Sequence, residues 1–287
     1  MSRHDPALEA VARDTMSIVE AGGFRASDGS WVSLGPAIAK AVAGTRVYGS
    51  DELDALLDGA TAPAGHRPPS RSGATHVIQV TCETTQEAAH RLAVDGELAL
   101  LNFASATRAG GGFLQGAKAQ EEDLARCSAL YECLRTQTEH YALHRARDSP
   151  LYSDAMIYSP AVPFFRVRSE SRLDRAYEAS VITAAAPNAT KAQRAGRVTP
   201  SELEAIFRRR TGKLLALAEA RGQRTLVLGA WGCGVFGNDP VMAADAFATW
   251  LEAPRFRESF AHVVFAVFDP RPDKPTFEAF ARRLAGA

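Results

Sequence analysis

The chain has 287 residues, enough for one large domain or for a domain with a substantial extension. Lysine and arginine (33) balance aspartate and glutamate (33), so the chain lacks the basic excess with which nucleic-acid-binding proteins neutralise phosphates. No stretch approaches the ~20 consecutive apolar residues of a membrane-spanning helix, and the first residues lack the apolar segment of a signal peptide. We therefore expect a cytoplasmic protein that binds neither membranes nor specific nucleic-acid sequences.

The cysteines are not spaced as a metal site or a disulfide framework. Cys82, Cys127, Cys133 and Cys233 include no Cys-x-x-Cys pair, and no histidines stand at zinc-finger spacing. They are also too few for a disulfide-stapled scaffold in a chain of this length. We expect reduced, mostly buried thiols and no bound metal.

The N-terminal region is predicted to be a helical extension. Apolar residues recur at helical spacing between Asp5 and Glu20, and Gly22-Gly23 ends that pattern. A short strand at 45–48 and a weaker helix at 50–57 follow. Residues 61–73 are rich in proline, glycine and serine, which favours a boundary there. We expect an extension over residues 1–70, packed on a main domain over residues 71–287.

Strand-like and helix-like segments alternate through the main domain. Strands are expected at residues 75–82, 97–104, 154–162, 180–187, 224–231 and 262–269. Helices are expected near residues 86–95, 121–145, 200–221, 240–251 and 274–284. Several strands are continuous apolar runs, typical of strands covered on both faces. The pattern predicts a three-layer α/β/α sandwich around a mixed, largely parallel sheet, with ligands bound in loops that follow the strands.

The loop after the strand at 97–104 has two notable features. Gly110, Gly111 and Gly112 permit positive φ and close approach of backbone amides to a ligand, although a plain flexible loop explains them equally well. The run Gln-Glu-Glu-Asp at 120–123 then opens a helix. Without further context such a run is more typical of a helix N-terminus, because acidic side chains complement the helix dipole.

A second glycine-rich loop follows the strand at 224–231. Gly232, Gly234 and Gly237 match the dinucleotide-binding pattern G-x-G-x-x-G. A Rossmann domain carries this pattern in its first βα unit, with further strands and an acidic residue about 20 positions on. Here one convincing strand follows, and Asp269 at its end is too distant. The loop is better explained as amides that hold a diphosphate at a helix N-terminus.

The spacing within the first loop resembles a known enzyme family. Three glycines followed after seven residues by Gln-Glu-Glu, within LNFASATRAGGGFLQGAKAQEEDLARCSALYECL, resemble the bacterial-type poly(ADP-ribose) glycohydrolases. The opening helix and the second loop are similar to that family too, so the resemblance covers most of the chain. It implies a macrodomain-like fold and hydrolysis of ribose–ribose O-glycosidic bonds. The implied substrates are poly(ADP-ribose) or ADP-ribosylated proteins, and the product is ADP-ribose.

The resemblance also implies roles for individual residues. Glu122 is similar to the catalytic acid, and Glu121 to the residue that fixes the adjoining ribose through its hydroxyls. The glycines at 110–112 resemble the loop that packs against the ribose and phosphate at the cleavage site. Phe236 is expected to pack against the distal ribose, and Glu83 to lie near the adenine amine. The other expected ADP-ribose contacts are Asn102, Gln120, Gly232, Cys233, Gly234, Val235 and Gly237.

Some of these assignments have alternatives that the sequence leaves open. Asn102 could equally satisfy its own turn, and the second asparagine of the macrodomain pattern is Ser105 here. Glu83 is as readily explained as a solvated carboxylate at a strand end. Cys233 is better explained as a packing residue than as a nucleophile, because no histidine lies near it in sequence.

The implied mechanism uses one glutamate and neither cofactor nor metal. Glu122 protonates the leaving oxygen as an oxocarbenium-like state forms, and then acts as base toward water. The substrate's diphosphate stabilises the cation. The two alternatives are an ADP-ribose-binding macrodomain without activity, which could dispense with the paired glutamates, and a mono-ADP-ribosyl hydrolase. We expect the protein to be a monomer.

Overall fold

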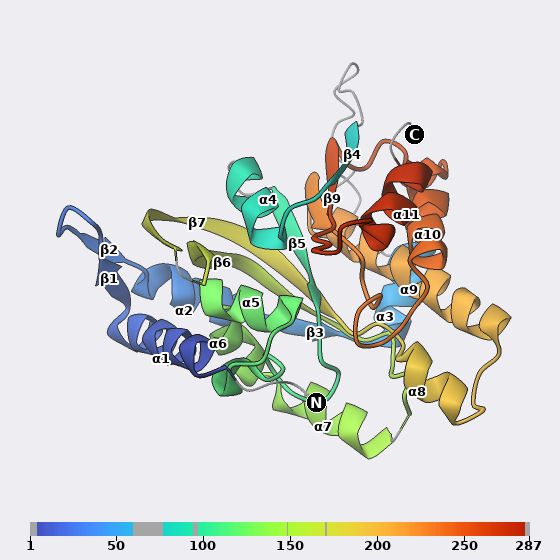
Figure 1. Ribbon diagram of the computed structural model, residues 1–287, viewed down its shortest axis with the longest axis horizontal. Helices are drawn as coiled ribbons and strands as arrows, with labels where there is room; N and C mark the ends of the chain where they lie inside the picture. The colour runs from blue at the N-terminus through green and yellow to red at the C-terminus, as the bar shows by residue number, and fades with distance from the viewer. Residues whose placement is uncertain (1–4, 60–76, 94–96, 148, 170, 285–287) are drawn as a thin grey trace.

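The computed structural model describes residues 5–59, 77–93, 97–147, 149–169 and 171–284 (Figure 1). The strands are β1 Gly23–Arg25, β2 Trp31–Ser33, β3 Arg46–Tyr48, β4 Val77–Thr81, β5 Leu98–Phe103, β6 Met156–Arg168, β7 Ser171–Ala184, β8 Thr225–Leu228 and β9 His262–Ala266. The helices are α1 Pro6–Ala21, α2 Gly35–Gly44, α3 Ser50–Leu57, α4 Thr85–Leu92, α5 Gln120–Cys127, α6 Leu130–Arg135, α7 Thr138–Arg147, α8 Ala189–Arg194, α9 Pro200–Ala220, α10 Pro240–Glu252 and α11 Pro275–Leu284. A short 3₁₀ helix, η1, covers Phe113–Gln115.

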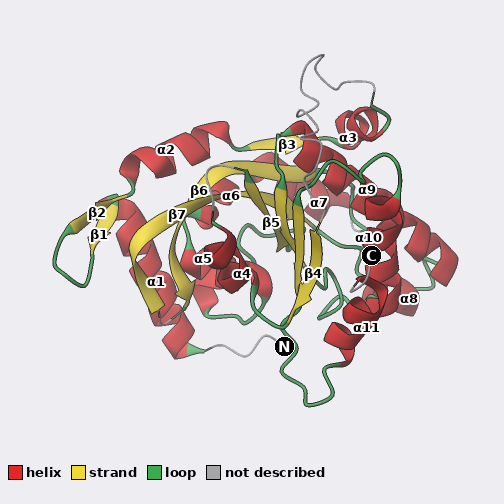
Figure 2. Ribbon diagram, turned by 90° about the horizontal axis from the view of Figure 1, so that it is seen from above, coloured by secondary structure: helices red, strands yellow, loops and turns green. Residues whose placement is uncertain are grey.

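Seven of these strands form one sheet in the order β3-β6-β7-β5-β8-β9-β4. The five strands β7, β5, β8, β9 and β4 are parallel to one another, whereas β6 is antiparallel to both β3 and β7. Helices cover both faces of the sheet (Figure 2). The expected three-layer sandwich with a mixed, largely parallel sheet is confirmed.

Alternation along β5 divides the hydrophobic core between the two faces of the sheet. Leu98 and Leu100 pack with buried residues of α4, α5 and α6. Ala99 and Leu101 pack with buried residues of α9, α10 and α11 on the other face. This period of two is the geometry of a pleated strand, and an apolar run such as 98–101 is buried on both sides because helices cover both faces.

The N-terminal region contributes to the sheet and packs on its long hairpin. β3 pairs with β6, as Val47 lies opposite Ile157. Asp14 of α1 forms ion pairs with Arg166 and Arg172 of β6 and β7. The boundary expected within 61–73 falls in residues 60–76, outside the described part, so the division at residue 70 stays a prediction.

The helix expected over 121–145 is wrong, because three helices, α5, α6 and α7, occupy this stretch. Ser128 ends α5 in an extended conformation, with φ −150° and ψ 178°. Its hydroxyl donates to Leu124 O at 2.7 Å and accepts from Leu130 N at 3.2 Å. A serine side chain that bonds to nearby backbone competes with the helical pattern, and that competition accounts for the break.

Two of the expected strands are much longer in the structure. The segments at 154–162 and 180–187 overlap β6 and β7, which form a hairpin of 13 and 14 residues, but they begin two residues too early and end three residues too late, respectively. Its outer half includes many polar and charged residues, which hide the strand period in the sequence. The small sheet of β1 and β2, together with α2 and α8, also had no counterpart among the expected elements.

Candidate active site

The two glycine-rich loops meet at one edge of the sheet. β5 lies between β7 and β8 in parallel register, so the carboxyl ends of these three strands are neighbours. Hydrogen bonds to one carbonyl join the segments that follow these strands: the backbone Ala104 N donates to Ala184 O at 3.1 Å, and the Trp231 indole Nε1 donates to the same oxygen at 3.0 Å. The loops lie at the lower edge of the sheet in Figure 1.

The first loop holds both glutamates through backbone amides. Gly112 N donates to Glu122 Oε1 at 2.8 Å, and Ser105 N donates to Glu121 Oε2 at 2.7 Å. Gly111 has φ +56°, and a Cβ at this position would overlap the Glu122 carboxyl. The glycine at position 111 is therefore required twice, by its backbone conformation and by the space that the carboxyl occupies.

Gln120 fastens the start of α5 to the end of β5. Its Oε1 accepts from Phe103 N at 2.8 Å, and its Nε2 donates to Leu101 O at 2.8 Å and to Thr85 Oγ1 at 3.0 Å. The side chain thus continues the hydrogen bonding of the strand edge and sets where α5 begins. In the described structure its polar atoms bond to the protein, so its expected contact with ADP-ribose stays a prediction.

Asp123, the third acidic residue of the run, has structural partners. It accepts hydrogen bonds from Gln86 and from Ser169 Oγ, and forms an ion pair with buried Arg126 at 3.2 Å. Arg126 also donates to Ala117 O at 2.8 Å, which ties α5 to the end of the glycine loop. The helix that carries the two glutamates is therefore anchored on both of its sides.

The two glutamates are buried side by side, with 2% of Glu121 and 9% of Glu122 exposed. Burial raises the pKa of Glu121 to about 8, and the neighbouring Glu122 adds to the rise. The Ser105 amide opposes it by donating to the carboxylate. Glu121 therefore exchanges its proton near neutral pH, which is uncommon for a carboxyl group outside a functional site.

Asn102 lies behind Glu121 and is fully buried. Its Nδ2 donates to Thr183 Oγ1 at 3.1 Å and, over a longer 3.4 Å, to Glu121 Oε1. Ser105, at the position of the second macrodomain asparagine, contacts Glu121 through its backbone amide. Both positions of the expected pattern are thus close to the glutamates, and Asn102 reaches them from the core side.

The second loop is a tight turn held by Asn238. Gly232 and Gly237 have φ of +74° and +66°, and Asn238 Nδ2 donates to Gly232 O at 3.0 Å and to Pro187 O at 2.9 Å. A Cβ on Gly232 would overlap the Asn238 amide. The turn thereby joins the loop after β8 to the segment after β7, and α10 begins directly behind it.

The side chains of this loop differ in exposure. Val235 is 87% exposed, whereas Phe236 is partly buried, with its ring 5.9 Å from that of Tyr152. Burial raises the pKa of Cys233 to about 12, so this residue remains a thiol rather than a nucleophilic thiolate. The loop therefore presents one half-buried aromatic ring beside the glycine turn.

Glu83 lies at the carboxyl edge of the sheet, but at the end of its outermost strand. It follows β4, the strand at the sheet edge, which β8 and β9 separate from β5. Its carboxylate pairs with Arg91 at 2.6 Å. This contact is that of a strand-end carboxylate with a local partner, and the expected proximity to adenine stays a prediction.

The structure also contains a buried charge cluster that the sequence analysis did not identify, and it contacts the segment that follows β7. Asp154 pairs with Arg209 and Lys213, each at 2.8 Å, and with Arg210 at 3.0 Å. The hydrogen bond from Arg209 and the charges of Arg210 and Lys213 hold the pKa of Asp154 well below its usual range despite its burial. Arg210 also donates to Ala185 O at 2.7 Å, at the end of β7. A signal existed in the sequence, since positions 210 and 213 fall on the buried stripe that includes Phe207 and Leu214.

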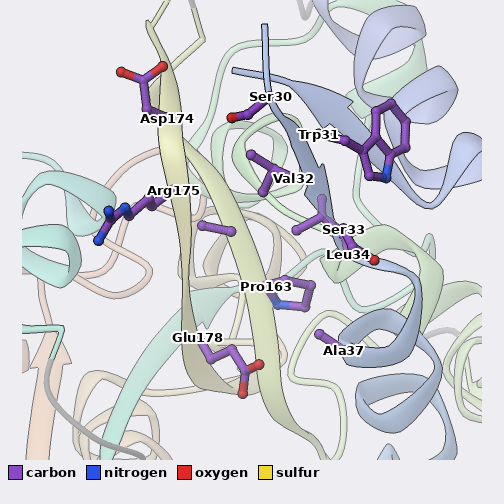
Figure 3. Close-up of a pocket in the computed structure, with 11 residues that line it drawn as sticks. Ser30, Trp31, Val32, Ser33, Leu34, Ala37, Pro163, Asp174, Arg175 and Glu178 are labelled. Carbon is purple, nitrogen blue, oxygen red and sulfur yellow. The ribbon is translucent and has the colours of Figure 1, made fainter. Parts of the chain in front are cut away.

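A surface groove lies away from the two loops. A groove of about 410 Å³ separates β2 from the outer half of β7, with Trp31 on one side and Asp174 and Glu178 on the other (Figure 3). It contains no residue of either glycine-rich loop. The residues that the structure describes also include no group of three or more His, Cys, Asp or Glu able to hold a metal ion.

The chain is similar to known proteins over most of its length. The model of the microbial-type PARG catalytic domain, where PARG is poly(ADP-ribose) glycohydrolase, matches residues 12–167. The crystal structure of PARG from Thermomonospora curvata is 45% identical, with a TM-score of 0.90 over 98% of this chain and 100% of that one. The same enzyme bound to the inhibitor ADP-HPD is 44% identical, with a TM-score of 0.89 over the same shares of both chains.

A second bacterial relative is more distant. PARG from Deinococcus radiodurans in complex with ADP-ribose is 40% identical, with a TM-score of 0.78 over 86% of this chain and 97% of that one. No curated protein matches the chain. On the family match and on the identity over nearly its whole length, the chain belongs to the microbial-type poly(ADP-ribose) glycohydrolases.

Proposed function

We propose that the chain hydrolyses ribose–ribose O-glycosidic bonds of poly(ADP-ribose) and releases ADP-ribose, with Glu122 as the residue that protonates the leaving oxygen. The observation that carries this assignment is the contact between the Glu122 carboxyl and the glycine loop. Gly112 N donates to its Oε1 at 2.8 Å, which fixes the carboxyl at the start of α5. Family membership supports the same chemistry, because the relatives are glycosidases that act on this polymer.

The arrangement suits a mechanism centred on one glutamate. As the glycosidic bond breaks, positive charge develops on the anomeric carbon and the leaving oxygen must gain a proton. With Oε1 held by the backbone, Oε2 of Glu122 is the oxygen that carries the proton to the leaving group. The resulting carboxylate then accepts a proton from the attacking water.

Glu121 would fix the ribose next to the scissile bond. The donors on its carboxyl, Ser105 N and Asn102 Nδ2, orient it from behind and leave its hydrogen-bonding capacity for ribose hydroxyls. Its raised pKa also matters for binding, because a carboxyl that is largely protonated at neutral pH repels the anionic substrate less. The second loop would hold the diphosphate on its backbone amides, and Phe236 would pack against the distal ribose.

The other parts of this proposal concern partners and location. Poly(ADP-ribose), free or attached to proteins, is the proposed substrate, and the relative from Deinococcus radiodurans was solved with ADP-ribose. A monomeric state and a cytoplasmic location stay predictions from the sequence. In the described ranges, no helix is long and apolar enough to span a membrane.

The decisive test is Glu122→Gln, assayed for release of ADP-ribose from purified poly(ADP-ribose). The amide keeps the shape of the side chain but cannot donate or accept the catalytic proton, so we expect turnover to fall about a hundredfold to ten-thousandfold. ADP-ribose binding, measured by calorimetry, should persist. Glu132→Gln, on α6 with Arg135 as its partner, is the matched control and should keep normal turnover.

Near-normal turnover by Glu122→Gln would refute the catalytic assignment. Activity of the unaltered protein on mono-ADP-ribosylated proteins but not on the polymer would replace the proposed reaction with removal of single ADP-ribose units.

A further inference from the structure

Asn102 and Thr183 are direct neighbours in the sheet. They are paired in the parallel register of β5 and β7. Because side chains alternate along a strand, both point to the same face as Leu100 and Val181, two positions earlier. That face packs against α5. Two polar side chains, 0% and 2% exposed, thus end an apolar face next to Glu121.

Within the described residues, the Asn102 side chain donates hydrogen bonds but accepts none. Its Nδ2 donates to Thr183 Oγ1 at 3.1 Å and to Glu121 Oε1 at 3.4 Å. Its Oδ1 is buried and has no hydrogen-bond partner within the described residues. A buried polar atom without a partner lowers stability, so packing alone does not favour an asparagine here. What Asn102 gains is an N–H group aimed at Glu121, and Thr183 fixes that direction by accepting the other hydrogen.

We propose that Thr183 and Asn102 are positioning residues for Glu121: the Thr183 hydroxyl orients the Asn102 amide, and this amide orients the Glu121 carboxyl toward the substrate ribose. The inference rests on the proposed function, in which Glu121 binds that ribose. It gives Asn102 a role that acts through Glu121, in place of the direct ADP-ribose contact that the family resemblance implies. The series of bonds crosses from β7 through β5 to α5, so the register of the sheet places the carboxyl.

Four further groups act on the Glu121 carboxyl from the elements around it. The amides of Ser105 and Gly110, in the glycine loop, lower its pKa, and Glu122 on the same helix raises it. On α7, burial and the Glu121 charge raise the pKa of the Tyr141 phenol, which therefore stays neutral. Asn102 is the side-chain donor that lowers the pKa of Glu121. If its amide turns away, the pKa of Glu121 rises further.

The test compares Thr183→Val, which removes the hydroxyl but keeps the branched shape, with Thr183→Ser, which keeps the hydroxyl. Thr211→Val is the matched control, because Thr211 is equally buried and donates to Phe207 O in α9, away from the site. ADP-ribose affinity is measured by calorimetry across pH 5 to 9, together with kcat and KM on poly(ADP-ribose) and thermal melts. Glu121→Gln identifies the inflection in affinity that belongs to Glu121.

We expect Thr183→Val to move this inflection to higher pH and to lower kcat/KM about threefold to tenfold, the effect of one lost hydrogen bond. Thr183→Ser and Thr211→Val should stay close to the unaltered protein. If Thr183→Val does not fold, Thr183→Ala makes the same comparison without the added methyl group.

Two results would overturn the inference, and they are distinguishable. If removing the hydroxyl changes only the melting temperature and leaves the inflection and kcat/KM in place, Thr183 merely packs. If Glu121→Gln changes neither affinity, its pH dependence nor turnover, then Glu121 does not bind the ribose and there is nothing for Asn102 to position. The proposed hydrolysis would still stand in either case, provided that Glu122→Gln is inactive.

Discussion

Replacing Glu121 by glutamine should stabilise the protein at neutral and alkaline pH. Glu121 is 2% exposed, and burial raises its pKa to about 8 from an ordinary value of 4.5. Below pH 4.5 the carboxyl is protonated in both the folded and the unfolded chain, so it causes no penalty. As the pH rises toward 8 the unfolded chain releases this proton while the folded protein keeps it, and the free energy of unfolding therefore falls.

The magnitude follows from the size of the shift. Each pKa unit corresponds to ~1.4 kcal/mol, so the penalty reaches at most a few kcal/mol above pH 8. Glutamine removes the titration and keeps the shape. Its Oε1 can accept from Ser105 N, and its amide can donate to the otherwise unpaired Oδ1 of Asn102 after that side chain turns over. At pH 8 we expect the free energy of unfolding of Glu121→Gln to exceed that of the unaltered protein by about 1–3 kcal/mol. At pH 4.5 the two free energies of unfolding should differ little.

Urea unfolding of both proteins across pH 4.5 to 8.5 measures this difference directly. Glu83→Gln, which neutralises a carboxylate outside α5, controls for the change in net charge. A stability difference that stays constant across this pH range would refute the claim that burial of Glu121 is costly. The variant should also be a poor enzyme, because the buried carboxyl that lowers stability is the group proposed to hold the ribose.

Other expected outcomes concern the loops, the charge cluster and metal independence. Gly111→Ala should lower turnover at least tenfold, because the new methyl group overlaps the Glu122 carboxyl and this position requires φ +56°. The measurement is kcat on poly(ADP-ribose), made with folded variant protein. Phe236→Ala should raise KM with little change in melting temperature, since its ring is only partly buried. Asp154→Asn should cost about 3–5 kcal/mol in unfolding free energy, because it leaves buried Arg210 without its carboxylate and removes one of the two carboxylates that pair with buried Lys213. Activity should survive EDTA; loss that added Mg²⁺ restores would contradict the one-glutamate mechanism.

The elements that the sequence predicted well are those whose apolar period reports burial. β5, β8 and β9 are short apolar runs covered on both faces, and α1, α9 and α10 begin and end close to the expected residues. One error arises where a side chain bonds to backbone. Ser128 breaks the expected helix at 121–145 through two such bonds, and nothing in the apolar period marks that break.

The site divides in the same way. The spacing of the glycines and glutamates was visible in the sequence, because the loop and the start of α5 are only a few residues apart. The contacts between distant residues around the site were not visible in the sequence. Thr183 is 81 residues from Asn102, and Arg210 is 25 residues from the Ala185 carbonyl that it binds. Such pairs depend on sheet order and register, and neither can be read from local spacing.

The contacts explain why glycines and glutamates occur together in this motif. Two adjacent carboxyls in a buried position repel each other and lose hydration, so the protein must supply donors close to both. Gly112 and Ser105 supply backbone amides, and the lack of a Cβ at Gly111 lets the loop approach Glu122 closely enough for this contact. Gln120 in turn fixes where the helix starts. Since each group depends on the position of the others, Gly111→Ala and Glu122→Gln together should cost less activity than the product of their separate losses.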